Sequence, residues 1–391
     1  MKSILMNGVL TMQPDENKYY DVNPIIDYAE KIDCPVVGIA GGKGNGKTYG
    51  IILKYLKRRF ADAQPKVLRY LRTYRESIAP KAIQSLCKPQ KQNLINLSGG
   101  KYNDFQYFQN RFWFVRRDDQ GKIVEKDRQP FIVCSALNSV EANTGADEGA
   151  CYAIFYDEVL SREKMIDDMF YKLMIFHNNC IRNRVDFYAP LILVGNTVTR
   201  NSILLTDFGV DLYSMKKGEI TVVKNSKKEP TIVFEYCNDV AVMRDAGDAY
   251  YKRFENDRIK MIYKGDWTTG NYPYIPTQER ENANNIVNLK LILKDNIALC
   301  FEFYVKTDRM FAYVRPYDDD DIKYIAVLIN KTQVYKDYHI FNYLPSGGIF
   351  KQFAKLVYTK NVYFDSFQTG EYFRDFLKNL KGCESIANVY I

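Results

Sequence analysis

The 391-residue sequence predicts an α/β domain with a parallel sheet, followed by a small linker subdomain and an α+β domain. Three observations predict this fold class. A glycine-rich turn joins a short apolar strand at 36–40 to a helix, and a second apolar strand at 151–158 ends in two carboxylates. A third apolar strand, at 190–194, ends in Gly195 and Asn196. We expect the three domains at 1–236, 237–290 and 291–391.

Composition excludes several kinds of site. Hydrophobic residues make up 46% and charged residues 26% of the chain, which is typical of a globular protein. The 2 histidines argue against histidine-based zinc sites, whereas 55 Lys+Arg and a net charge of +8 favour polyanionic partners. The 8 cysteines form no C-x-x-C pair, which is typical of reduced thiols in a cytosolic protein. We find no apolar stretch of the roughly 20 residues that a membrane span needs.

The strongest motif is the glycine-rich turn at 41–48, GGKGNGKT, which fits G-x-x-x-x-G-K-[ST] (Walker A). Its glycines let backbone N–H groups surround phosphates, and the following helix directs its positive end toward them. The predicted phosphate-binding residues are Gly41, Gly42, Lys43, Gly44, Asn45, Gly46, Lys47 and Thr48. Lys47 would reach the β- and γ-phosphates of ATP and the Thr48 hydroxyl would bind Mg²⁺. The alternative is a chance glycine-rich turn, but strand, loop and helix follow in the order that nucleotide binding needs.

Two adjacent acids complete the predicted site. The segment 151–158, CYAIFYDE, is a buried-type strand that ends in Asp157 and Glu158. Asp157 would hold Mg²⁺ through water, and Glu158 would polarise the attacking water as a general base. Two acids at a strand end also suit a plain turn. Their place after a phosphate loop favours the catalytic interpretation.

Further strands surround these motifs. We expect a strand at 66–71 and a hairpin at 112–131 with Gly121 in its turn. The strand at 190–194 should lie beside the two motif strands, which would bring Asn196 to the γ-phosphate. The alternative is that Asn196 is an ordinary turn residue.

Basic residues supply the remaining candidates. A helix predicted at 165–184 ends in Ile-Arg-Asn-Arg, and Arg182 or Arg184 would stabilise the transition state in a neighbouring subunit. The equally simple alternative is that these arginines complement the dipole at the helix end. Arg72 and Arg75, after the second strand, are secondary candidates for nucleotide or coupling roles.

Together, GGKGNGKT, AIFYDE, LVGNT and IRNR resemble a viral DNA-packaging ATPase, the terminase large subunit. The short chain is most similar to the encapsidation proteins of small tailed phages with terminal-protein-primed genomes. An inserted strand and a glutamate after Asp157 resemble the additional-strand, ring-motor branch of P-loop NTPases. At the level of motifs, the resemblance covers about the first 235 residues.

The resemblance implies ATP and Mg²⁺ as cofactors and double-stranded DNA as the substrate that is moved. It also implies a homo-oligomeric ring of five subunits on the capsid portal, with a packaging RNA or terminal protein as further candidate partners. The protein would act in the host cytoplasm, transiently on the procapsid, and would be neither membrane-bound nor secreted.

The carboxy-terminal part resembles the RNase H-like nuclease domain of large terminases. Strands predicted at 297–305 and 310–314 form a hairpin, and a strand at 361–364 precedes Asp365. Cutting needs carboxylates that hold two metals about 4 Å apart. Glu302 stands where the family has aspartate, Asp365 matches the second acid, and near the chain end only Glu384 is available as a third. We therefore expect a vestigial nuclease domain, with an active nuclease as the alternative.

The leading hypothesis is an ATP-driven motor that moves double-stranded viral DNA into a preformed capsid. A helicase or another ring-shaped translocase would share the ATP site. A nucleotide-gated binding or assembly protein with negligible turnover is an alternative from a different class.

Overall fold

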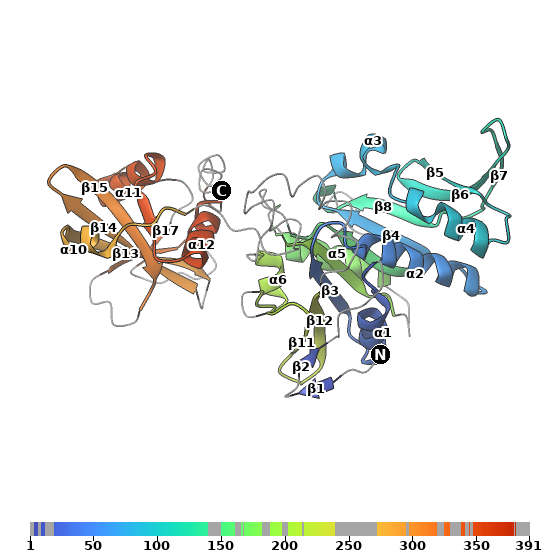
Figure 1. The fold of residues 1–391 in the computed structure, drawn as a ribbon, viewed down its shortest axis with the longest axis horizontal. Coiled ribbons are helices and arrows are strands. Elements are labelled where there is room, and N and C mark those ends of the chain that lie inside the picture. The colour runs from blue at the N-terminus through green and yellow to red at the C-terminus, as the bar shows by residue number, and fades with distance from the viewer. Residues whose placement is uncertain are drawn as a thin grey trace. The chain divides into compact units, whose positions relative to one another are not determined.

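The structure is a computed structural model that divides into two compact units, Met1–Thr268 and Thr269–Ile391 (Figure 1). It describes residues 4–6, 9–11, 19–139, 150–160, 166, 168–181, 188–197, 202–212, 215–238, 272–294, 297–318, 324–328, 338–340, 344, 347–378 and 380. The boundary between the units falls inside the predicted linker range 237–290. Residues 284–290 belong to the first strand of the second unit, which therefore begins earlier than position 291.

The first unit is built on a 12-stranded sheet with the order β1-β2-β11-β12-β3-β10-β9-β4-β8-β6-β5, with β7 beside β6. Its strands are β1 Ile4–Met6, β2 Val9–Thr11, β3 Val36–Gly41, β4 Val67–Arg72, β5 Asp104–Phe108, β6 Arg111–Arg117, β7 Ile123–Lys126, β8 Ile132–Ala136, β9 Cys151–Asp157, β10 Leu191–Asn196, β11 Glu219–Lys224 and β12 Pro230–Tyr236. Its helices are α1 Asn23–Lys31, α2 Lys47–Ala61, α3 Pro80–Ile83, α4 Lys91–Leu97, α5 Met169–Ile181 and α6 Ile203–Asp207, with short 3₁₀ turns at Arg75–Ile78 and Lys88–Gln90.

Six neighbouring strands, β12, β3, β10, β9, β4 and β8, are parallel. The predicted strand at 190–194 is β10, which pairs with both β3 and β9 as expected. It is therefore β10 that is inserted between the two motif strands in the sheet, whereas the strand predicted at 66–71 is β4 and lies beyond β9. The predicted hairpin at 112–131 is confirmed as β6 and β7, with Gly121 in the turn at φ 80°.

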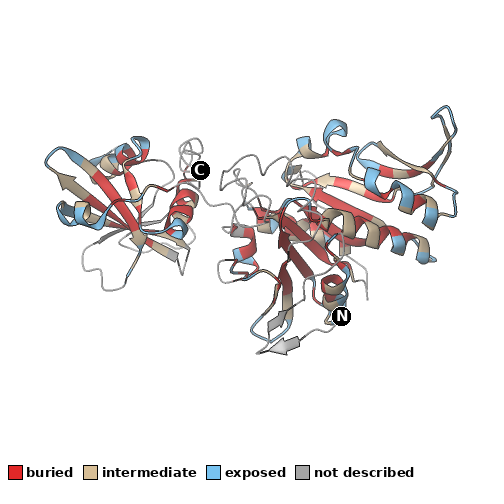
Figure 2. Cartoon of the chain, in the orientation of Figure 1, coloured by how far each residue is buried: buried red, intermediate tan, exposed pale blue. Residues whose placement is uncertain are grey.

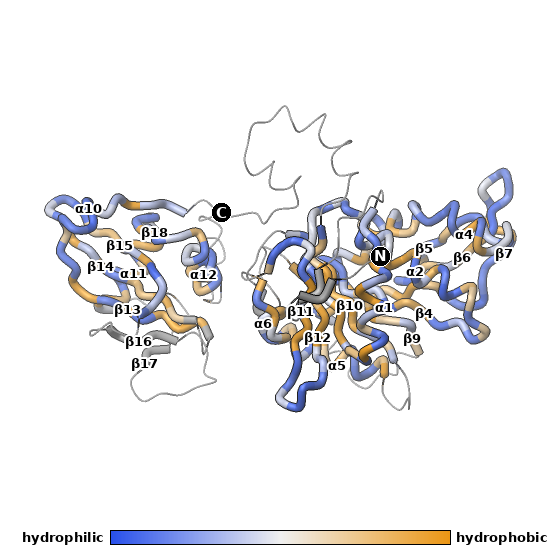
Figure 3. The backbone as a smooth tube through the Cα atoms, turned by 60° about the horizontal axis from the view of Figure 1, so that its bottom comes forward, coloured by the Kyte–Doolittle hydropathy of each residue, from blue (hydrophilic) through white to orange (hydrophobic). Residues whose placement is uncertain are grey.

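Two hydrophobic cores cover opposite faces of this sheet. One core packs α1, α2 and α4 against one face, and the other packs α5 and α6 against the opposite face over β9, β10 and β3. All seven residues of β9 are buried because this strand lies between both cores. Figures 2 and 3 show the buried, apolar central strands and the more polar outer helices of this unit. Within the described ranges, no helix is long and apolar enough to cross a membrane.

The second unit has a 6-stranded mixed sheet with the order β17-β16-β13-β14-β15-β18. Its elements are α10 Thr277–Glu281, β13 Asn284–Lys294, β14 Ile297–Lys306, β15 Arg309–Pro316, β16 Tyr324–Leu328, β17 Tyr338–Ile340, α11 Gly348–Tyr358, β18 Val362–Phe364 and α12 Phe367–Lys378. Strands β13, β14 and β15 are antiparallel neighbours. Helices α11 and α12 pack on one sheet face through a phenylalanine-rich core that includes Phe301, Phe353 and Phe373. The α+β character expected from the sequence is confirmed.

A close approach inside the parallel sheet fixes the residue type at position 38. Gly38 in β3 lies opposite Phe234 in β12. A Cβ atom at position 38 would lie 2.1 Å from Cδ2 of the Phe234 ring. Only glycine therefore lets β12 pair with β3 immediately before the phosphate loop.

We predict that Gly38→Ala destabilises the first unit by about 1–3 kcal/mol because the added methyl group overpacks a dense core. Chemical denaturation would measure the loss. Adding Phe234→Leu removes the ring and should restore part of the stability. An unchanged unfolding midpoint for Gly38→Ala, or a further loss in the double variant, would contradict the packing argument.

Candidate nucleotide-binding site

The phosphate loop runs from the end of β3 to the start of α2, which begins at Lys47. Gly44 and Gly46 have φ values of 82° and 98°, in the left-handed region that favours glycine. This backbone turns the chain sharply and leaves the first N–H groups of α2 at the loop. A helix start of this kind is a suitable site for phosphate.

Lys47 is 4% exposed and its ammonium group lies inside the loop. Lys47 Nζ donates to the carbonyl oxygens of Gly41 (3.0 Å) and Gly42 (2.8 Å) and to Oδ1 of Asn45 (3.1 Å). It also donates to Oδ1 of Asn196 at 3.3 Å. Burial lowers the pKa of Lys47. An anion at this loop would therefore offset the desolvation of the charged lysine.

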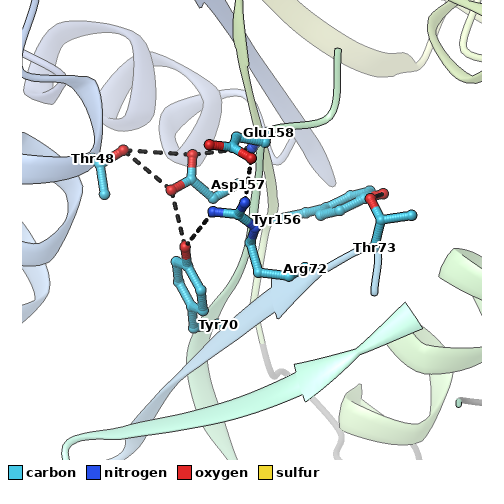
Figure 4. A network of polar contacts seen from close by, with 7 residues as sticks. All are labelled: Thr48, Tyr70, Arg72, Thr73, Tyr156, Asp157 and Glu158. Atoms are coloured by element: carbon cyan, nitrogen blue, oxygen red, sulfur yellow. Dashed lines mark hydrogen bonds and ion pairs between the residues drawn. The ribbon is translucent and has the colours of Figure 1, made fainter. Parts of the chain in front are cut away.

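The second cluster forms where β9 ends beside the start of α2 (Figure 4). Thr48 Oγ1 lies 3.3 Å from Oδ2 of Asp157, and the Tyr70 hydroxyl donates to the same oxygen at 3.1 Å. Asp157 is 8% exposed, and burial raises its pKa. A hydroxyl and a carboxylate at this separation suit neighbouring positions around Mg²⁺, which prefers oxygen ligands and keeps several waters.

Glu158 follows Asp157 in the chain, and its backbone is in the left-handed region at φ 61°. This conformation is uncommon for a residue with a Cβ, and strained residues of this kind concentrate at functional sites. Arg72, at the end of β4, donates from Nη2 to the Glu158 carboxylate and from Nη1 to the Tyr70 hydroxyl at 3.2 Å. Figure 4 shows Arg72 between Tyr70 and Glu158. The secondary candidate Arg72 therefore contacts the predicted general base.

Behind the phosphate loop lies a set of hydrogen bonds that the sequence did not predict. The Tyr20 amide donates to the Asn45 carbonyl at 2.9 Å, and the Tyr20 hydroxyl donates to Glu235 in β12 at 2.5 Å. Two residues later, Cys237 accepts from Nδ2 of Asn45 at 3.0 Å. These contacts brace the phosphate loop against β12 and the amino-terminal segment. The contacts of Glu235 and Cys237 join residues about 200 positions apart in the chain, so no local pattern marks them.

The structure thus brings Lys47, Thr48, Asn196, Asp157 and Glu158 to one edge of the sheet. Of the remaining loop positions, Lys43 and Gly44 are exposed. Arg182 and Arg184 lie outside the described residues, as does Glu384. The arginine and third-acid predictions therefore stay predictions.

The two acids predicted for a vestigial nuclease are positioned by strands that are not neighbours in the sheet. Strand β15 lies between β14, which carries Glu302, and β18, which precedes Asp365, so the two strands are about 9.6 Å apart. Glu302 accepts from Nε of Arg315 at 2.8 Å and from the Tyr304 hydroxyl at 2.9 Å. No group of three or more His, Cys, Asp or Glu side chains suited to a metal occurs among the described residues.

We predict that Glu235→Gln changes the pH dependence of stability. Burial raises the pKa of Glu235 to about 7, above about 4.3 for an unfolded glutamate. The folded chain therefore binds this proton more tightly, and its stability falls as pH rises from about 4.3 to 7. Relative to the wild type, the variant should gain on the order of 3 kcal/mol across this window and nothing further above pH 8.

Unfolding free energies measured between pH 5 and 8 would test this expectation, with Glu76→Gln at an exposed glutamate as the matched control. A stability difference between Glu235→Gln and wild type that stays constant with pH would contradict it.

Comparison with known proteins gives fold similarity without sequence similarity. No protein-family model matches the chain, and no curated protein matches it in sequence. The Phi-28 gp11 DNA packaging motor aligns with a TM-score of 0.52 and 17% identity, over 93% of this chain and 98% of that chain. The bacteriophage Phi-29 viral genome packaging motor assembly aligns with a TM-score of 0.52 and 13% identity, over 93% and 100%. The large terminase of a thermophilic bacteriophage aligns with a TM-score of 0.39 and 11% identity, over 94% and 86%.

The first two alignments span both units of the chain. At these identities they show the fold alone. The expected resemblance is confirmed at this level: the chain has the fold of phage DNA-packaging motor proteins.

Proposed function

We propose that the protein is an ATP-driven motor that moves double-stranded viral DNA into a preformed capsid. The observation that carries the proposal is the juxtaposition of Lys47, Thr48, Asp157 and Glu158 at one sheet edge. It occurs in a fold shared, over 93% of the chain, with proteins described as DNA packaging motors. The phosphate loop supports ATP binding, and the fold supports the coupling of ATP to DNA.

Each residue has a defined role in ATP hydrolysis. The loop N–H groups and Lys47 bind the β- and γ-phosphates, and the Asn196 amide contacts the γ-phosphate or its water. Thr48 and Asp157 would hold Mg²⁺, which when bound neutralises charge on the phosphates. Glu158 orients and polarises the attacking water. In the present arrangement Arg72 holds the Glu158 carboxylate, so Glu158 must leave this ion pair to act as a base.

The assembly around this site is proposed from the same resemblance. The chain would form a homo-oligomeric ring of five subunits on the capsid portal, and Arg182 or Arg184 would reach the ATP of a neighbouring subunit. A packaging RNA or a terminal protein would be a further partner. The motor would act in the host cytoplasm and transiently on the procapsid.

The second unit would be an RNase H-like domain that does not cut DNA. Its mixed sheet has antiparallel β13, β14 and β15, with β16 parallel to β13. The ion pair with Arg315 occupies Glu302, and β15 separates it from Asp365. Two metal ions about 4 Å apart need carboxylates that converge, so this arrangement supports a vestigial domain.

The proposed function predicts ATP hydrolysis that double-stranded DNA stimulates. Lys47→Ala should weaken ATP binding, whereas Glu158→Gln should keep binding and lower turnover by roughly 10²–10⁴-fold. Rates of phosphate release, with and without DNA, and fluorescent-nucleotide titrations would measure both effects. Equal ATP affinity and equal turnover in the two variants would refute the site. Turnover that DNA leaves unchanged would favour a nucleotide-gated binding protein.

We predict that Arg72→Ala raises ATP hydrolysis in the absence of DNA several-fold, because the Glu158 side chain, already 54% exposed, loses the ion pair that holds it. Arg116→Ala, at an exposed arginine of β6 for which no role at the nucleotide site is proposed, is the matched control and should leave the rate unchanged. The same steady-state assay measures both. A basal rate in Arg72→Ala equal to that of wild type would show that the ion pair does not restrain Glu158.

A further inference from the structure

Asn45 is held by more contacts than its place in the phosphate loop requires. The motif G-x-x-x-x-G-K-[ST] leaves position 45 open to any residue. In the structure Asn45 is 1% exposed, and both the oxygen and the nitrogen of its side-chain amide have partners. Its backbone carbonyl also accepts from the Tyr20 amide at 2.9 Å. A buried polar side chain that is paired at both ends indicates a defined role in the loop.

The partners of Asn45 fix the orientation of its amide. Oδ1 accepts from the backbone amide of Lys47 at 3.3 Å and from Lys47 Nζ at 3.1 Å. Both of these groups are donors, so the oxygen of the Asn45 amide must face them. Nδ2 therefore points the other way, where it donates to Sγ of Cys237 at 3.0 Å.

Cys237 lies just past the end of β12, beside the start of the phosphate loop. Strand β12 pairs in parallel with β3, and Tyr236 lies opposite Ala40. The Cys237 amide then donates to the Ala40 carbonyl at 2.8 Å. This places the thiol against Gly41, where an added Cβ atom would lie 2.1 Å from Sγ. Because Cys237 is only 1% exposed, its sulfur is enclosed behind the loop.

The sulfur is the acceptor that keeps the Asn45 amide from turning. Among the described residues, Nδ2 of Asn45 has no other hydrogen-bond partner. Loss of the sulfur would leave a buried donor unpaired, which is costly unless the amide rotates. Rotation would carry Oδ1 away from Lys47 and would remove one of the contacts that hold Nζ inside the loop. The position of the ammonium group thus depends on the thiol through the amide.

We propose that Cys237 is a positioning residue for nucleotide binding, which acts through Asn45 on the Lys47 ammonium. The inference rests on the proposed nucleotide site and adds to it a residue that lies 192 positions after Asn45. Phosphates would meet a lysine that is already oriented, which reduces the entropic cost of binding. The alternative is that Cys237 only fills space in the hydrophobic core to which it belongs.

Replacing the thiol separates these two roles. Cys237→Ala removes the acceptor, and we expect it to weaken binding of a fluorescent, non-hydrolysable ATP analogue to the full chain by roughly tenfold. Cys237→Ser keeps an acceptor, so its affinity for the analogue should stay within about twofold of the wild type.

Cys34→Ala is the matched control, because Cys34 is a buried cysteine that lies just before β3, at the opposite end of this strand from the loop. Its Sγ donates to the Val36 carbonyl at 3.4 Å, so the control also deletes a buried sulfur and one hydrogen bond. It should leave the affinity for the ATP analogue unchanged.

A double-mutant cycle tests whether the thiol acts through the amide. Asn45→Ala should weaken binding about as much as Cys237→Ala. Adding Cys237→Ala to Asn45→Ala should change the affinity no further, because the two side chains act as one unit. Additive losses would show that Cys237 acts independently of Asn45 and would overturn the proposal.

The serine variant gives the second decisive result. An equal loss of affinity in Cys237→Ser and Cys237→Ala would indicate space filling and would overturn the proposal, as would wild-type affinity in Cys237→Ala. If Cys237→Ala does not fold, Asn45→Ala and Cys237→Ser decide, and wild-type affinity in Asn45→Ala would contradict the proposal. A wild type that binds no ATP analogue would refute the nucleotide site itself, whereas the other contrary results would refute only the role of Cys237.

Discussion

The parallel register of β3, β10 and β9 is the constraint on which the nucleotide site depends. Asn196 lies opposite Gly41, and Val194 lies opposite Asp157, so all three strands end at one edge of the sheet. The phosphate loop, the Asn196 amide and the two acids come together there although a long stretch of chain separates β3 from β9. A shift of one residue in β10 would turn its side chains to the other face and remove Asn196 from Lys47. The packing of β12 against Gly38 holds the same register from the other side.

The charges buried at this edge are consistent with the proposal that a nucleotide and its cation bind there. Burial lowers the pKa of Lys47 and raises that of Asp157, so both charged forms are disfavoured where they stand. A nucleotide with its cation would supply the missing opposite charges. Glu302 in the second unit shows the contrasting arrangement, because Arg315 and Tyr304 already satisfy its carboxylate.

Local patterns predicted the motif strands, the phosphate loop and the β6–β7 hairpin, because each depends on residues close in the chain. The position of β10 beside both motif strands was expected, whereas the position of β4 beyond β9 depends on sheet order, which the chain order of the strands does not determine. The ion pair of Arg72 with Glu158 spans 86 positions, and the Tyr20–Glu235 bond spans 215, so neither leaves a local signature. Residues 284–290 of β13 fall inside the range 237–290 that was expected to be the linker. Their pairing with β14, which joins two separate strands, makes them part of the second sheet.

The central claim is that ATP hydrolysis at Glu158 drives DNA into a capsid. The most direct measurement is the length of DNA that becomes protected from nuclease inside portal-bearing procapsids supplied with the protein and ATP. The account predicts protected DNA of full genome length with the wild type and none with Glu158→Gln, although that variant still binds ATP. Vigorous ATP hydrolysis without protected DNA, together with strand separation of forked DNA in the absence of capsids, would contradict it and identify a helicase.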